Sequence, residues 1–259
     1  SNAIKQLNKF IEVGYQDYAK YRSDPSKEAS SQLSPYFHHG QISTHEVFDK
    51  ISELESWSPE SINPKMVGRR EGWWGSTENF ESFMDELITW RELGYHTCVR
   101  RANYNQYSSL PEWAIKTLHE HSSDEREHIY SLDELTYSQT HDEIWNAAQN
   151  QLRTQGVIQN YLRMLWGKKI LEWTPNPQIA LSYMITLNDR YSLDGRDPNS
   201  YSGVFWILGR YDRAWGPERS IFGKIRYMTS DSTARKFNLK PYLEKWGNES
   251  LGVSTSILK

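Results

Sequence analysis

Apolar side chains recur at every third or fourth position along most of this chain. This spacing gathers them on one face of a helix, whereas a half-buried strand requires strict alternation. The pattern is clear over residues 4–18, 80–98 and 161–173, and the last of these helices should end at Thr174-Pro175. Strict alternation is missing, and no internal repeat is visible. The sequence therefore predicts one all-α domain.

Local signals set the expected boundaries of this domain. Thr140-His141-Asp142-Glu143 has the form of a capping box, which predicts a helix beginning just before Trp145. Residues 193–200, LDGRDPNS, should form a loop because they combine Asp-Gly with Asp-Pro. Residues 1–3 resemble the remnant of a cleaved tag. We therefore expect the domain to cover residues 4–246, with a frayed tail at 247–259.

Charge and composition restrict the function. The 30 basic and 33 acidic residues nearly balance, so a contact with DNA must come from a local groove and not from a general positive field. The single cysteine, Cys98, excludes an internal disulfide and suits a reducing cytoplasm. No apolar run approaches the roughly 18 residues that a membrane span needs. We expect a cytoplasmic monomer.

Aromatic residues are unusually frequent: they make up 14% of the chain and include 11 tryptophans. They can simply fill a core. They can also stack on flat ligands or pass electrons from ring to ring.

A phosphate-binding segment is harder to find. The dinucleotide fingerprint GxGxxG and the P-loop are both missing. The remaining candidate is the segment from Ser30 to Ser34, where Ser30, Ser31 and Ser34 stand just ahead of an expected helix start. The same residues can equally form an ordinary helix cap and turn.

At this segment the sequence resembles a known family. SSQLSPY, preceded by Tyr18 and Arg22, is similar to the flavin-phosphate segment of the photolyase/cryptochrome family. The resemblance extends from about residue 10 to 246, in a form that looks like the class II branch. It implies the all-helical domain that holds FAD folded into a U, without a metal. The other similar blocks are ELITWREL (86–93), THDEIWNAAQ (140–149), NYLRMLWGKKILEW (160–173), LNDRYSLDGRDPN (187–199) and FGKIRYM (222–228).

The resemblance also implies the residues that bind FAD. Asn188 would lie beside N5 of the flavin ring, although an Asn near a helix end is most often a cap. Arg163 and Asp194 would form a pair that braces the other side of the ring, a role that suits an ion pair that is expensive to desolvate. The full implied set is Tyr18, Arg22, Ser30, Ser31, Leu33, Ser34, Arg91, Asn160, Arg163, Asn188 and Asp194.

A lesion pocket is implied as well. Glu86 and Trp90 stand at i and i+4, so on an α-helix they share one face. By resemblance, Glu86 would hydrogen-bond the damaged pyrimidines, and Trp90 and Trp206 would form aromatic walls, since rings stack on any base. Without the resemblance, Glu86 is a solvated helix carboxylate and Trp206 is core packing.

Three further tryptophans form a predicted relay. Trp166 and Trp173 are seven residues apart, so on one helix they share a face about 10 Å apart along the axis. Trp145, on the preceding helix, is the candidate for a third ring between them. By resemblance they would photoreduce the flavin, in an order that the sequence leaves open. From spacing alone they are core residues.

The implied partner is DNA that contains pyrimidine dimers. Arg213, Lys224 and Arg226 fall in a segment similar to the family's duplex-binding edge, although isolated basic residues are usually only solvated surface. A dimer must leave the base stack before a cofactor can reach its ring bonds, and photolyases are a standard example of base-flipping enzymes.

The resemblance therefore implies an enzyme: a photolyase that repairs cyclobutane pyrimidine dimers by light-driven electron transfer from reduced FAD. Two alternatives remain, a cryptochrome-like photoreceptor and an inactive FAD-binding fragment. The chain departs from the family at Ile158-Gln159, where a His usually stands, and a Gln can hydrogen-bond but cannot move a proton. It also shows nothing like the family's N-terminal α/β antenna domain, which a full-length protein would carry.

Overall fold

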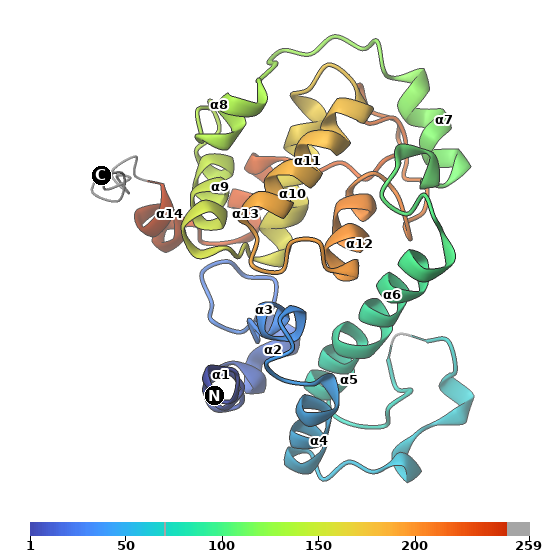
Figure 1. The fold of residues 1–259 in the computed structure, drawn as a ribbon, viewed down its shortest axis with the longest axis vertical. Helices are drawn as coiled ribbons and strands as arrows, with labels where there is room; N and C mark the ends of the chain where they lie inside the picture. The colour runs from blue at the N-terminus through green and yellow to red at the C-terminus, as the bar shows by residue number, and fades with distance from the viewer. Residues whose placement is uncertain (70, 248–259) are drawn as a thin grey trace. The chain divides into compact units, whose positions relative to one another are not determined.

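The computed structural model describes residues 1–69 and 71–247 and confirms the all-α fold (Figure 1). Within these residues no strand forms, and β pairing is limited to one isolated bridge between Arg219 and Gly223. None of the described helices is both long and apolar enough to cross a bilayer. Apart from Gly247, the predicted tail at 247–259 lies outside the described residues.

The helices divide into two compact units. The first contains residues 1–109 and 193–203, and the second contains residues 110–192 and the chain from 204 onward. Helix α12 (Pro198–Ile207) supplies residues to both.

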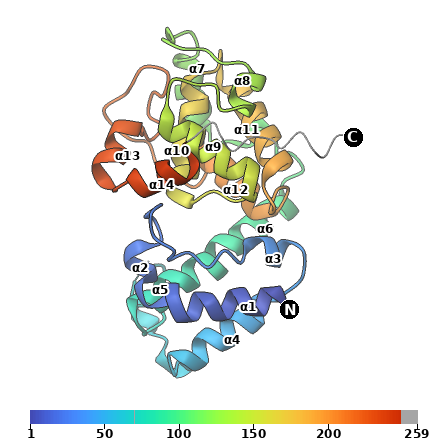
Figure 2. The same cartoon turned by 90° about the vertical axis from the view of Figure 1, so that its left-hand side faces the viewer.

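The first unit packs its helices around an aromatic core, and Figure 2 shows α1, α4 and α5 within it. Phe83 of α5 contacts the rings of Phe10, Tyr15 and Tyr18, with ring centroids between 5.1 and 6.3 Å apart. Edge-to-face contacts of this kind add to the burial of apolar area. The helices are α1 (Asn2–Lys9), α2 (Tyr18–Tyr21), α3 (Ser34–His38), α4 (Thr44–Leu54), α5 (Glu78–Met84) and α6 (Arg91–Arg100).

Two of the predicted helices contain a π-helical turn, over Phe10–Gly14 and Asp85–Trp90. The first turn brings Gly14 against the chain near Glu28: a Cβ on Gly14 would lie 2.9 Å from the Glu28 carbonyl oxygen, so no side chain fits there. The second turn contains both Glu86 and Trp90. π turns are frequent at functional sites because they change the direction of side chains within a helix.

The second unit is built around α10 (Asn160–Glu172), which packs against α9 (Glu143–Gln155) and α11 (Pro177–Tyr191) (Figure 1). Gly167 permits the close approach of a neighbouring side chain, because a Cβ there would lie 2.1 Å from Cδ1 of Ile207. The remaining helices are α7 (Glu112–Glu120), α8 (Leu132–Thr136), α13 (Ser230–Lys236) and α14 (Lys240–Trp246).

Helix α9 begins near the predicted place but with a different cap. Asp142, and not Thr140, is the N-cap, and its carboxylate accepts the backbone N–H of Trp145 at 2.9 Å. The Thr140 hydroxyl instead donates to Asn146 Oδ1 at 2.8 Å. Asp is at least as good a cap as Thr, and here it stands one residue before the helix, where its carboxylate reaches the N3 amide. At the end of α10, Trp173 follows the last helical residue, as Thr174-Pro175 predicted.

Candidate functional site

The predicted phosphate segment lies in the first unit and leads into α3, which begins at Ser34 as expected. Leu33 is fully buried and anchors the segment, while Ser31 accepts the side-chain N–H of Gln6 at its carbonyl oxygen, at 2.9 Å. Gln32 adopts a left-handed φ of 54°, which bends the chain ahead of the helix. Helix α3 has five residues and Pro35 lacks an N–H, so hydroxyls and loop amides matter here more than a helix dipole.

The loop that carries Asp194 is attached to the end of α3. His38 Nδ1 lies 3.4 Å from Asp197 Oδ2, and His39 Nε2 lies 3.2 Å from the carbonyl oxygen of Leu193. The carbonyl of Asp194 accepts the hydroxyl of Ser200 at 3.1 Å. The first unit therefore places two predicted cofactor segments, distant in sequence, beside each other.

A third predicted cofactor residue, Arg91, also faces α3. Its guanidinium lies 5.2 Å from the ring centroid of Phe37 and equally far from that of Tyr95. It donates to the Tyr95 hydroxyl at 3.1 Å. A flat cation held by two rings keeps a fixed orientation.

Glu86 forms an ion pair with Arg22, although we expected these two residues to act separately. The two side chains are about one-third exposed, at 36% and 32%. The pair lies beside Tyr18, whose ring centroid is 5.8 Å from the Arg22 guanidinium. Burial raises the pKa of the Tyr18 phenol, and the Glu86 charge raises it further, so this hydroxyl stays protonated and can donate a hydrogen bond.

The π turn changes the partner of Trp90. On a regular α-helix Trp90 would stand over Glu86, four residues earlier. Here its indole N–H donates to Asp85 Oδ2, five residues earlier, at 2.9 Å. The i,i+4 argument therefore does not describe this helix, because a π turn brings residues five apart together.

In the second unit, Arg163 contacts Asn188. The Arg163 guanidinium donates to Asn188 Oδ1 at 3.3 Å, and Asn188 is buried in the last turn of α11. The Asn188 side chain is thus held within the unit and does not cap the helix. Asp194 belongs to the other unit, so its pairing with Arg163 stays a prediction.

Asn160 is the first residue of α10, and the departure at Gln159 has a structural role. The side-chain Oε1 of Gln159 caps the helix, accepting the backbone N–H groups of Tyr161 at 2.8 Å and Leu162 at 3.2 Å. Gln is not among the preferred capping residues, so the sequence gave little signal for this role.

The three relay tryptophans lie together in the core of the second unit. Trp145, Trp166 and Trp173 are each at most 2% exposed. The rings of Trp145 and Trp173 meet edge to face at 5.7 Å, and the Trp145 N–H donates to the carbonyl oxygen of Trp166 at 3.0 Å. The Trp166 N–H donates to Gln149 Oε1 at 2.9 Å. Trp145 therefore contacts the ring of Trp173 and the backbone of Trp166, and the relay itself stays a prediction.

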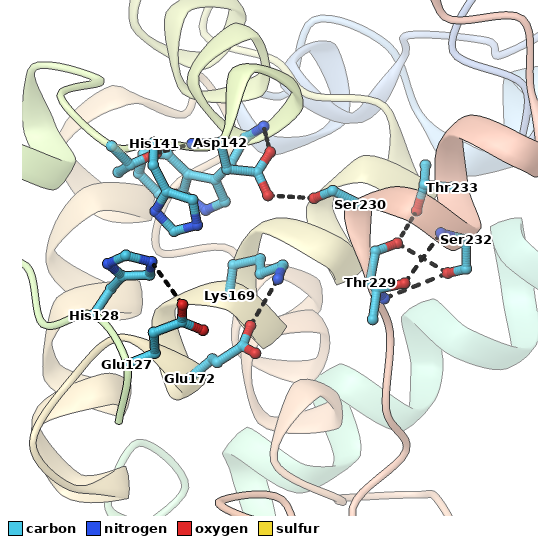
Figure 3. Close-up of polar contacts among 12 residues, drawn as sticks. Glu127, His128, His141, Asp142, Lys169, Glu172, Thr229, Ser230, Ser232 and Thr233 are labelled. Carbon is cyan, nitrogen blue, oxygen red and sulfur yellow. Dashed lines mark hydrogen bonds and ion pairs between the residues drawn. The ribbon is translucent and has the colours of Figure 1, made fainter. Parts of the chain in front are cut away.

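Polar groups border the Trp173 end of this cluster. The Lys169 ammonium lies 5.4 Å from the Trp173 ring and pairs with Glu172 at 2.8 Å (Figure 3). The His141 ring lies 5.2 Å from Trp173 and 3.9 Å from the His128 ring. Burial, followed by the neighbouring His128, lowers the pKa of His141. The opposite end of the cluster, at Trp166, is closed by Gln149, which is fully buried.

Trp206 differs from its neighbours on α12. Phe205 and Ile207 are completely buried, whereas Trp206 is only partly buried. Simple core packing would bury the largest side chain of this run as well. Partial exposure is what an aromatic wall of a pocket requires.

The predicted DNA-contacting residues converge on a ring that the sequence argument overlooked. The guanidinium groups of Arg213 and Arg226 lie 4.5 and 5.1 Å from the ring centroid of Trp215. The Trp215 backbone N–H donates to the carbonyl oxygen of Lys224 at 2.9 Å. We call residues 213–226 the basic loop. The order Arg213-Ala214-Trp215 was the available signal, since an Arg two residues from a Trp suggests stacking.

Solved structures share this fold. The chain aligns with a class III photolyase from Agrobacterium tumefaciens at a TM-score of 0.66 and 18% identity, covering 94% of this chain and 44% of that one. It aligns with a cryptochrome from Synechocystis at 0.67 and 14%, covering 95% and 44%. A Sulfolobus tokodaii photolyase, solved with two FAD molecules, aligns at 0.59 and 16%, covering 99% and 48%. The fold is that of a helical domain found in photolyases and cryptochromes.

Sequence relatives narrow the relationship. The chain is 41% identical over 245 residues to a deoxyribodipyrimidine photo-lyase of Methanothermobacter thermautotrophicus, covering 95% of this chain and 50% of the relative. It is 39% identical over 246 residues to one of Potorous tridactylus, covering 95% and 43%. No family model matches the chain. The chain is thus a relative of the DNA photolyases, as its sequence blocks predicted, and spans about half the length of these relatives.

Proposed function

We propose that this chain is the catalytic helical part of a class II photolyase, which binds FAD and uses light to split cyclobutane pyrimidine dimers in DNA. The observation that carries the proposal is its identity of about 40% to deoxyribodipyrimidine photo-lyases along 95% of its length. The candidate FAD-binding residues, the candidate lesion-contacting residues and the buried tryptophan cluster each support it.

Candidate FAD-binding residues are present in each unit, and each set supports the proposal by itself. The phosphates suit the hydroxyls and loop amides of Ser30–Ser34, and Arg91 can supply charge close by. The flavin ring suits the Arg163–Asn188 contact, since a buried carboxamide held by a guanidinium gives a fixed hydrogen-bonding group beside a ring nitrogen. Bound FAD in its reduced form supplies an electron on absorbing light. The residues therefore fit the cofactor.

The residues proposed to contact the lesion are the Arg22–Glu86 pair and Trp90 in the first unit and, separately, Trp206 in the second. Trp90 and Trp206 are both partly buried and present ring surface on which a flipped dimer can stack. Arg22 orients the Glu86 carboxylate, and the protonated Tyr18 hydroxyl adds a donor nearby. Polar groups that are already oriented can stabilise charge that appears on the pyrimidines only after electron transfer.

The buried tryptophan cluster would restore the reduced flavin. Trp145 contacts the Trp173 ring and the Trp166 backbone, which supports a path for electrons through the three residues. All three indoles are shielded from water, and the indole N–H groups of Trp145 and Trp166 are hydrogen-bonded.

A photoreceptor of the cryptochrome type is the second candidate, because the fold is shared with a Synechocystis cryptochrome. The partial exposure of Trp206 and the Arg22–Glu86 pair favour repair, since a receptor needs no lesion pocket. An inactive FAD-binding fragment is the third. We also propose that the protein is a monomer located in the cytoplasm.

Purified protein should be loaded with FAD, reduced, and illuminated with blue light in the presence of a dimer-containing oligonucleotide. Loss of dimers in the light and not in the dark supports repair. Trp206→Ala should erase the preference for damaged over undamaged duplex. Bound flavin without dimer loss would favour the photoreceptor, and no flavin binding would contradict the proposal.

A further inference from the structure

The basic loop has no helix of its own and is anchored to the end of α7 by side chains. The Asp124 carboxylate accepts the backbone N–H of Ile221 at 2.8 Å and the hydroxyl of Ser220 at 3.2 Å. The Thr117 hydroxyl oxygen accepts the backbone N–H of Lys224 at 3.0 Å. The chain passes so close that a Cβ on Gly223 would lie 2.1 Å from Thr117 Oγ1. These polar contacts therefore fix the backbone of the loop beside the end of α7, while Phe222 and Ile225 of the loop are buried in the core.

His121 lies between two carboxylates of this network. Its Nδ1 is 2.7 Å from Asp124 Oδ2, and its Nε2 is 3.5 Å from Glu218 Oε2. A carboxylate can only accept, so both ring nitrogens must carry protons for both contacts to be favourable. The geometry thus fits an imidazolium that joins α7 to the basic loop.

The surrounding charges agree with this protonation state. The hydrogen bond that His121 donates to Asp124 raises the pKa of His121, and the hydrogen bond to Glu218 raises it further. The Ile221 amide, followed by His121, lowers the pKa of Asp124, and Lys224 lowers the pKa of Glu218. Of the other basic groups facing the cluster, Lys224 Nζ lies 3.1 Å from Glu218 Oε1, and Arg126 donates to the backbone carbonyl of Asp124 at 2.7 Å.

We propose that His121 is a positioning residue for DNA binding: its imidazolium bridges Asp124 and Glu218 and so fixes the basic loop in a DNA-contacting conformation. The inference deepens the proposed function and rests on it for the identity of the ligand. Its chemistry is that of a phosphodiester backbone, which Arg213, Lys224 and Arg226 would contact.

The bridge should weaken as the pH rises. A histidine whose folded pKa is raised stabilises the folded state fully below its unfolded pKa, near 6.5, and loses that contribution as the pH passes through the folded value. Loss of the proton also leaves the cluster of His121, Asp124, Glu218 and Lys224 one charge more negative. The loop then becomes less ordered and less attractive to phosphate at the same time.

The first test measures hydrogen-exchange protection of the Ile221 and Lys224 amides, without DNA, at pH 6 and pH 9. In the wild type the protection factors should fall on the order of tenfold, the change expected when a charge-assisted hydrogen bond of about 1.4 kcal/mol is lost. In His121→Gln the protection factors should be low at both pH values, as they are in the wild type at pH 9. His119→Gln, an exposed histidine two residues earlier on α7, is the matched control and should behave as the wild type.

Glu218→Gln separates titration from damage to the fold, because it keeps a hydrogen-bonding group and removes only the charge. It should shift the midpoint of the pH dependence to lower pH without abolishing it. The inference would be overturned if the protection factors were the same at both pH values and were unchanged in His121→Gln.

The second test measures binding of a dimer-containing duplex at the same two pH values and constant ionic strength. Wild-type affinity should fall severalfold at pH 9, and His121→Gln should lose this difference. If DNA binds equally at both pH values in both proteins, the positioning role is wrong while the proposed function stands. The wild type could instead bind no DNA while the protection factors still depend on pH and on His121. In that case the proposed function is wrong, and so is the assignment of the basic loop to DNA binding.

Discussion

The buried tryptophan cluster and the basic loop are both functional candidates of the second unit, but different forces hold them in place. Trp145, Trp166 and Trp173 lie on or next to two packed helices and are almost inaccessible to water. The basic loop contains no helix; it buries Phe222 and Ile225, but its backbone is also held by polar contacts with Asp124 and Thr117. The cluster is thus fixed by packing, which is stable over a wide range of pH and salt, whereas the loop depends in addition on charges and hydrogen bonds.

This difference predicts how each region responds to change. Substitutions in the buried region should have large effects, because cavities and buried charges are costly there. Substitutions at exposed charges should have small effects, because water screens them. The size of the effect should therefore decrease from the buried region to the exposed one.

Trp145→Phe should remove most of the light-driven reduction of bound flavin, since it takes away the ring that contacts both other tryptophans. It should cost roughly 1–3 kcal/mol of stability through the lost indole hydrogen bond and a small cavity. Photoreduction is followed by flavin absorbance with a thiol donor. Trp246→Phe is the control, because that buried tryptophan of α14 lies outside the cluster. Equal photoreduction in the two variants would make the cluster ordinary core.

Lys168, on the same helix as Trp166, tests the cost of a buried charge. It is fully buried, donates to the carbonyl oxygen of Ile207, and burial lowers its pKa from 10.5 to about 7. Between these values the unfolded chain binds a proton that the folded one does not, so stability should rise with pH. Lys168→Met should abolish that rise and stabilise the protein by roughly 1–3 kcal/mol at pH 6–7.

The measurement is urea unfolding between pH 6 and pH 10, followed by circular dichroism. Lys116→Met, on the exposed face of α7, is the matched control and should keep the wild-type pH dependence. A wild-type stability that stays constant from pH 7 to pH 10 would contradict the lowered pKa.

The same division explains what the sequence could predict. The helices and the end of α10 follow from apolar periodicity and one proline, which are local signals, whereas the grouping of Trp145 with Trp166 and Trp173 was suggested by the family resemblance. The π turn at Asp85–Trp90 was missed because it arises from packing of the whole helix, and the Trp90–Asp85 contact was missed with it. The anchor of the basic loop was also missed, because Asp124 and Ile221 are 97 residues apart and neither has a motif.

Glu86 is intermediate between the buried and the exposed positions, since its side chain and that of its partner Arg22 are each about one-third exposed. Glu86→Gln should change stability by less than about 1 kcal/mol, as is usual for a partly exposed ion pair. If the proposed function is right, the repair yield per absorbed photon should nevertheless fall severalfold, because Glu86 would then act on the lesion only after electron transfer. Parallel measurement of lesion affinity checks this, since affinity should fall less than yield. An unchanged yield would return Glu86 to the role of a solvated carboxylate.

The smallest effect is expected at Arg226, the exposed end of the series. Its guanidinium rests on Trp215 and would contact one phosphate, so Arg226→Ala should weaken damaged and undamaged duplex alike. The slope of log K against log salt should become shallower by about one, which corresponds to one lost phosphate contact. The net charge of −3 limits binding to a local cluster of cations, so the wild-type slope should itself be modest.

Arg235→Ala on α13 is the matched control for this last prediction, because it removes one exposed positive charge and changes the net charge by the same amount. If Arg226 acts through a specific phosphate contact, Arg235→Ala should leave the salt slope unchanged. If it acts only through the overall field of the protein, both variants should shift the affinity equally. Because Arg226 and Arg213 both stack on Trp215, Trp215→Ala should lower the slope further than Arg226→Ala alone, by releasing both guanidinium groups. An identical slope in Trp215→Ala and the wild type would show that the ring does not organise the basic loop.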